Sequence, residues 1–306
     1  MFRFAAFIAL FLSSFAVQAA EVRVLTSIKP LQLIAAAVQD GLGQPEVLLP
    51  PGASPHHFAL RPSDVRRVQS TDLLYWIGPD METFLPRVLT GRDKPSVAVQ
   101  TLPGLTLRHF GEGAAHEHEH EHADEHDADE HDHDHRPGSL DAHLWLLPAN
   151  ARVIAAKMAA DLVAADPANA ALYQANLAAF EQRLSGLDGE LKARLAPLAS
   201  KPFFVFHQAF DYFEAAYGLQ HSGVFSAASE VQPGARQVAA MRERLKAAGA
   251  ACVFSEPPLR PRLAETLSSG LPVKLAELDA LGAKAPSYEQ LLEDLAGGLA
   301  GCLESL

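Results

Sequence analysis

The chain is poor in cysteine, in basic residues and in long apolar runs. It has two cysteines among 306 residues and no CxxC pair, which argues against a thiolate metal site. The chain has 25 lysines and arginines and 37 aspartates and glutamates, which gives a net charge of −12. A nucleic-acid partner would require a basic face, and this charge gives no sign of one. After the first twenty residues no apolar run approaches the ~20 residues of a membrane span, so we expect a soluble mature protein.

The first twenty residues have the pattern of a cleavable secretory signal peptide. Arg3 gives a positive start, residues 4–15 are almost wholly apolar, and residues 17–19 offer small side chains for cleavage. The alternative is an uncleaved membrane anchor, for which the apolar run is short. Because no cysteine follows the run, lipid attachment at a mature N-terminal cysteine is excluded. We expect a free periplasmic protein of a Gram-negative bacterium.

The two cysteines, Cys252 and Cys302, both lie in the last quarter of the chain. In an oxidising compartment they are expected to pair, closing a loop of 50 residues. Chain-entropy arguments predict that such a bridge stabilises the folded state by about 4 kcal/mol, and strain in the bridge can reduce this value. Two buried thiols are the alternative.

Most of the negative charge is concentrated in one segment, residues 112–137, called here the His/acid tract. Residues 112–135 hold eleven acidic side chains and no lysine or arginine, so the rest of the chain is close to neutral. The tract also contains eight histidines: His116, His118, His120, His122, His126, His131, His133 and His135. It cannot bury a core, and we expect it to be disordered without metal.

Short strands alternate with helices on both sides of this tract, which predicts an α/β fold with small parallel sheets. Strands are expected at residues 21–27, 46–49, 72–77, 96–100, 203–206, 252–255 and 272–275. Helices are expected at residues 31–40, 63–70 (capped by Ser63), 81–89, 149–165, 210–217, 237–248, 259–269 and 288–303. We therefore expect two lobes, residues 21–166 and 199–306.

A long helix is expected between the lobes, at residues 167–198. Its apolar side chains from Leu177 onward recur at spacings of three and four, which places them in one stripe. Such a helix would be about 45 Å long at about 1.5 Å per residue, a rigid spacer between the lobes. Ligands of such sheets bind beyond the carboxyl ends of the strands, so the cleft between the lobes is the natural site.

Six histidines lie outside the tract, and three of them are placed at strand or loop ends. His56 follows a proline-rich loop, His143 lies where the ordered chain resumes, and His207 closes an apolar strand. Three imidazole nitrogens with one oxygen ligand suit tetrahedral zinc. His57, His109 and His221 are interpreted as structural or surface residues, with His57 as a spare ligand.

Several segments resemble the zinc-specific solute-binding proteins of ABC importers, in order along the mature chain. These segments are GASPHHFALRPSD at 52–64, DAHLWL at 141–146 with Pro148, HQAFDYF at 207–213, EVQPG at 230–234, FSEP at 254–257 and LDALG at 278–282. The position of the His/acid tract also matches. The resemblance implies two lobes joined by a rigid helix, with the metal bound between them.

The resemblance also implies the ligands and the partners. His56, His143 and His207 match the metal ligands of that family, and a carboxylate or water fills the fourth position. Asp279 matches a carboxylate ligand of manganese-binding relatives. Those relatives carry glutamate where this chain has His207, a change that favours zinc. In zinc-uptake members the two cysteines form a disulfide.

The expected function is a zinc receptor that works as a monomer and performs no chemistry. It would deliver Zn²⁺ to an inner-membrane ABC permease, with other periplasmic zinc-binding proteins as further partners. The His/acid tract would capture zinc and pass it to the cleft; the alternative is a solvated tract with incidental affinity. Manganese or iron import is the runner-up function, followed by copper or nickel. A zinc hydrolase is disfavoured because no HExxH motif occurs outside the low-complexity His/acid tract.

Overall fold

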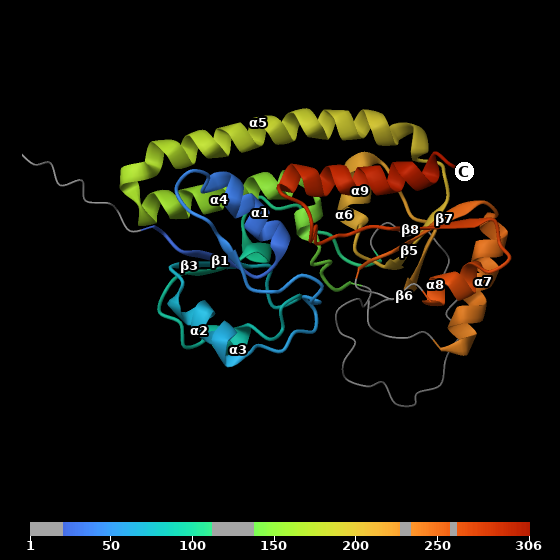
Figure 1. The fold of residues 1–306 in the computed structure, drawn as a ribbon, viewed down its shortest axis with the longest axis horizontal. Coiled ribbons are helices and arrows are strands. Elements are labelled where there is room, and N and C mark those ends of the chain that lie inside the picture. Colours follow the sequence, from blue (N-terminus) through green and yellow to red (C-terminus); the bar gives the residue numbers. More distant parts are fainter. Residues whose placement is uncertain (1–20, 112–137, 227–233, 258–261) are drawn as a thin grey trace, which may run out of the picture.

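The computed structural model describes residues 21–111, 138–226, 234–257 and 262–306, which form two α/β lobes joined by helices (Figure 1). The expected signal peptide, the His/acid tract with its eight histidines, and the first four residues of the motif at 230–234 lie outside the described residues. Among the described residues, no helix has both the length and the apolar character needed to cross a bilayer.

The first lobe is built on a four-stranded parallel sheet with the order β2-β1-β3-β4. Its strands are β1 (Val24–Thr26), β2 (Glu46–Val47), β3 (Leu73–Trp76) and β4 (Ser96–Ala98). The helices among them are α1 (Lys29–Val38), α2 (Pro62–Ser70) and α3 (Pro86–Leu89). The central strands β1 and β3 are buried throughout, as expected of parallel strands covered on both faces.

The second lobe repeats this strand order along its own chain, β6-β5-β7-β8, again wholly parallel. Its strands are β5 (Phe203–His207), β6 (Gly223–Ser226), β7 (Ala251–Ser255) and β8 (Val273–Glu277). The helices among them are α6 (Asp211–Tyr217), α7 (Ala235–Ala248) and α8 (Arg262–Ser268). In both sheets the first strand of the lobe is therefore central, and its carboxyl end points toward the region between the lobes (Figure 1).

Three longer helices complete the fold: α4 (Pro148–Ala165) in the first lobe, α9 (Tyr288–Leu303) in the second, and α5 (Ala170–Leu195) between the lobes. Helix α5 runs along the top of both lobes above α4 and α9 (Figure 1). The expected single helix at 167–198 is α5 with a short 3₁₀ turn at each end, Pro167–Asn169 and Ala196–Leu198.

The apolar stripe predicted for α5 forms its buried face from Phe180 onward. Phe180, Leu184 and Leu191 are buried there, whereas Leu172 near the beginning of the helix is 41% exposed. Tyr173 is buried in place of Leu172. The long helix expected between the lobes is thus packed along this face; its rigidity stays a prediction.

The disulfide between Cys252 and Cys302 is confirmed, with the two Cα atoms 6.2 Å apart. Cys252 lies on β7 and Cys302 near the end of α9, and both side chains are buried. The bond ties the last helix to the centre of the second sheet.

Three local expectations were wrong. Strand β6 was not predicted, because Gly223 begins a segment of only four residues. Residues 81–85 form turns rather than helix, since the buried Glu82 carboxylate accepts the N–H groups of Ile77 and Gly78. Helix α2 begins at Pro62 with Arg61 as its N-cap instead of Ser63, because proline fits the first helical position.

Candidate metal centre

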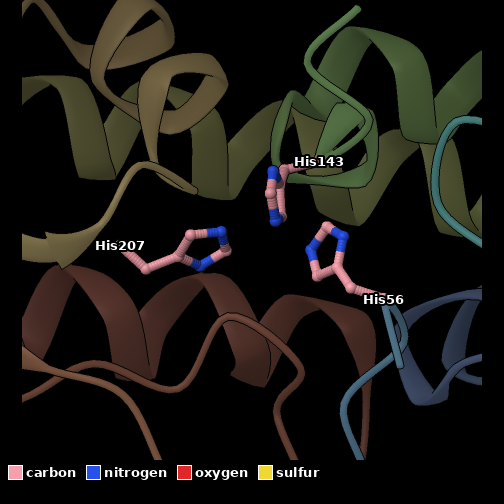
Figure 2. A group of neighbouring side chains, drawn as sticks. All are labelled: His56, His143 and His207. Carbon is pink, nitrogen blue, oxygen red and sulfur yellow. The ribbon is translucent and has the colours of Figure 1, made fainter. Parts of the chain in front are cut away.

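The structure brings together His56, His143 and His207, which come from three separate segments (Figure 2). His56 lies in the loop between β2 and α2. His143 caps the 3₁₀ turn Leu144–Leu146 that precedes α4, and His207 is the last residue of β5. Two rings therefore come from the first lobe and one from the second.

The three imidazole rings are close enough to share one ion. Their centroids are 5.4 Å apart for His56 and His143, 5.5 Å for His56 and His207, and 4.9 Å for His143 and His207. One nitrogen of each ring lies within 4.8 Å of the others. All three side chains are buried, so an ion among them would be shielded from bulk water.

A buried carboxylate fixes the ring of His143. The Nδ1 atom of His143 lies 2.8 Å from Oδ1 of Asp141, which also accepts the backbone N–H of His143 at 3.0 Å. With Nδ1 occupied by Asp141, Nε2 is the nitrogen left for the centre of the cluster. This is the outer-shell arrangement that commonly orients metal-binding histidines.

The electrostatics of this pair keep the imidazole ready for a metal. Burial, together with the charges of His207 and His56, holds the pKa of His143 well below its usual range. Burial also raises the pKa of Asp141 to about 7, against the effect of its hydrogen bond from His143. His143 is therefore neutral near neutral pH, the form in which imidazole binds a metal.

A second carboxylate lies behind His207. Oε1 of Glu256, which directly follows β7, is 3.3 Å from Nδ1 of His207. Sequence reasoning required such partners without naming them. The signals were present: Asp141 stands two residues before His143, and Glu256 lies in the FSEP motif.

Buried hydrogen bonds between the lobes hold the cluster in place. The hydroxyl of Tyr212 on α6 accepts the N–H of Arg108 and donates to the carbonyl of Asp141, each at 2.9 Å. Nε1 of Trp145 donates to the carbonyl of Ala280, and the hydroxyl of Tyr288 donates to the carbonyl of Trp145. The relative position of the ligands is thus set by tertiary contacts around them.

Asp279, also predicted as a ligand, is not in the cluster of the three histidines. Its Oδ1 accepts the N–H groups of Leu281 and Gly282, and its Oδ2 accepts that of Ala283. The carboxylate therefore caps a turn. His57 is exposed, with its ring centroid 6.5 Å from that of His56, and His109 pairs with Leu140 in an isolated antiparallel bridge.

Sequence reasoning missed a second group of potential ligands. Asp211, Glu214 and His221 each offer one ligand atom, and these atoms lie within 4.8 Å of one another. His221 was expected to be structural or on the surface. The signal was two carboxylates three residues apart at the beginning of a helix, with a histidine after the glycine that ends it.

Comparison with known proteins places the chain in a family. A family model described as ZnuA, zinc-uptake complex component A, periplasmic, matches residues 24–302. The high-affinity zinc uptake system protein ZnuA of Brucella abortus (strain 2308) is 39% identical over 304 residues, covering 92% of this chain and 91% of its own length. The protein of that name from Yersinia pestis is 39% identical over 293 residues, covering 93% and 92%.

Solved structures share the fold at low sequence identity. A crystal structure of ZnuA superposes with a TM-score of 0.76 at 22% identity, covering 92% of this chain and 99% of the other. The periplasmic zinc-binding protein TroA from Treponema pallidum gives a TM-score of 0.75 at 20% identity, with the same coverage. The family model and the relatives at 39% identity together show that the chain belongs to the ZnuA family of periplasmic zinc-uptake components.

Proposed function

We propose that the chain is a periplasmic receptor that binds one Zn²⁺ ion with His56, His143 and His207 and delivers it to an ABC importer in the inner membrane. The observation that carries this proposal is the convergence of three buried imidazole nitrogens within 4.8 Å. Zinc accepts such a set at bond lengths of about 2.0–2.1 Å, with a fourth oxygen ligand completing a tetrahedron. Membership of the zinc-uptake family supports the choice of metal.

The fourth ligand is a water molecule or a carboxylate. Asp279 stays a candidate, but to reach the ion it would have to give up hydrogen bonds from three backbone N–H groups. A carboxylate held by several N–H groups is already well stabilised, so this exchange would be costly. The geometry therefore favours water in the fourth position.

The site is suited to carrying an ion rather than to catalysis. Each known outer-shell contact, Asp141 to His143 and Glu256 to His207, is used to orient a ligand. Outside the His/acid tract the sequence contains no HExxH motif, and the family consists of uptake components. Residues 1–20 would direct export to the periplasm and then be removed.

The His/acid tract is proposed to capture zinc close to the cleft. Its two ends are joined to the body at one place, where the N–H of Phe110 donates to Ser139 and the N–H of Gly138 donates to Phe110. The chain then continues directly to Asp141 and His143. An acidic tract attached there would raise the local concentration of cations beside the site.

Two titrations test the function. Deletion of residues 112–137 should leave the tightest zinc site intact and remove the weaker binding that the tract contributes, as measured by competition with a chromophoric chelator. Loss of the tightest site in this variant would refute the assignment to the three histidines. Competition between Zn²⁺ and Mn²⁺ on the same variant should favour zinc; a preference for manganese would support the runner-up function.

A further inference from the structure

The second lobe contains another cluster of side chains that could bind a metal. All of them come from one stretch of eleven residues, 211–221. Asp211 and Glu214 occupy the first turn of α6, three residues apart and therefore on the same face. Gly218 ends the helix in the left-handed conformation, with φ of 70°. This reversal returns the chain so that His221 lies against the two carboxylates.

The contacts within this cluster are unequal. Nδ1 of His221 lies 2.9 Å and 3.0 Å from the two carboxylate oxygens of Glu214, and Oε2 also accepts the backbone N–H of His221. Oδ1 of Asp211 is 3.8 Å from the same Nδ1. The other oxygen of Asp211 accepts a hydrogen bond from Gln208 at 2.7 Å. Oδ1 is buried and accepts no hydrogen bond among the described residues.

The cluster also carries an excess of negative charge. Two carboxylates face one imidazole, so the net charge stays negative even when His221 is protonated. Burial and then the charges of Glu214 and Asp141 raise the pKa of Asp211 to about 6. Burial lowers the pKa of His221, but the hydrogen bond and the charge of Glu214 outweigh it and raise that pKa overall. The surroundings therefore favour a cation at this position.

We propose that Asp211, Glu214 and His221 form a second divalent-cation site, which takes Zn²⁺ in place of the proton on His221. One imidazole and two carboxylates form a mixed nitrogen and oxygen set that suits zinc. The side chains of Asp211 and His221 are each 17% exposed, so an ion can enter from solvent. Asp211 follows His207 by four residues along the chain, so the second cluster begins just after a residue of the first.

Binding requires a small local adjustment. Ligand atoms around tetrahedral zinc lie about 3.3 Å apart, so Glu214 and His221 must separate by a few tenths of an ångström. Asp211 supplies the missing ligand when its Oδ1 moves toward the imidazole.

Anomalous scattering at the zinc edge, on crystals of the full chain grown with excess Zn²⁺, tests the proposal directly. We expect a peak among Asp211, Glu214 and His221, at about 2.0–2.2 Å from the ligand atoms, besides the peak at the three histidines. The second peak should vanish in Asp211→Asn, which keeps the Glu214–His221 pair, while the first peak persists. A filled first site with no density at the second cluster would overturn the proposal, as would a peak that survives the substitution.

Counting bound zinc in solution gives an independent check. Equilibrium dialysis of the full chain against Zn²⁺ should show about one ion less per chain for Asp211→Asn and for His221→Gln than for the unchanged protein. His109→Gln, which removes an imidazole outside the cluster, is the matched control and should retain the full count. Equal counts in all four proteins would show that the cluster is a structural ion pair between α6 and the following turn.

Discussion

The two ligand clusters of this chain differ in how the fold assembles them. His56, His143 and His207 come from three segments of both lobes, with 150 residues between the first and the last of the three. Asp211, Glu214 and His221 come from one helix and the turn after it. The first cluster is wholly buried and rich in nitrogen, whereas the second is partly exposed and rich in carboxylate oxygen.

This difference has consequences for function. The geometry of a cluster assembled across two lobes depends on the contacts that fix the position of one lobe against the other. Its affinity for zinc can therefore change with that position. A cluster assembled within one short segment has no such dependence. The geometry of the first cluster therefore depends on the relative position of the lobes, whereas the geometry of the second depends only on its own segment.

The largest expected effect is loss of a ligand from the first cluster. His207→Ala should weaken the tightest zinc site by at least about 100-fold, because even removal of an outer-shell partner commonly costs 10–100-fold. A chelator-competition titration measures the change. His221→Gln in the second cluster is the control and should leave the tightest site nearly unchanged. Comparable losses in both variants would remove the distinction between the clusters.

Removal of the carboxylate behind His143 should have the next largest effect. Asp141→Asn keeps the size of the side chain but loses the charge that orients the ring, so zinc affinity should fall by about 10–100-fold. Glu256→Gln should act in the same direction through His207. In contrast, Asp211→Asn should leave the tightest affinity as it was. An Asp141→Asn variant with unaltered affinity would show that the pair contributes to folding alone.

Weakening the contact between the lobes should affect one cluster and spare the other. Tyr288→Phe removes the hydroxyl that donates to the buried carbonyl of Trp145, at a cost of about 1–3 kcal/mol in unfolding free energy. Urea unfolding measures this cost. We expect zinc binding at the three histidines to weaken several-fold, with no change at the second cluster. Equal weakening of zinc binding at both clusters would show that the second cluster also depends on the contact between the lobes.

The smallest expected effect is that of a moderate change in pH. The pKa of Asp141 is raised to about 7, so the carboxylate that holds His143 is charged above that pH and gains a proton below it. Zinc affinity at the three histidines should therefore fall as the pH drops from about 7 toward 5. The lowered pKa of His143 delays its own protonation to still lower pH. Titrations at several pH values measure this; unchanged affinity would argue against three imidazole ligands.

Local signals in the sequence were sufficient for much of the fold. The final helix begins and ends where it was predicted, Tyr288–Leu303, because Ser287 caps it through the N–H of Gln290. The predicted helix at 81–89 was mostly wrong because Glu82 is drawn to backbone N–H groups of the preceding strand end. Here local hydrogen bonding between the buried side chain and the backbone overrides helix propensity.

The three histidines could be selected from their positions at strand and loop ends and from the family motifs. Their outer-shell partners and the second cluster could not, since these depend on distances such as that from Glu256 to His207. The turn-capping role of Asp279 likewise becomes visible only when its backbone donors are placed. The roles of the tract histidines stay predictions.

The central claim is that the first zinc ion binds among His56, His143 and His207. An anomalous difference map at the zinc edge, from crystals of the full chain supplied with one equivalent of Zn²⁺, tests it most directly. We predict a single strong peak about 2.0–2.1 Å from one nitrogen of each ring. A first peak at the second cluster, at Asp279 without the histidines, or in the His/acid tract would contradict it.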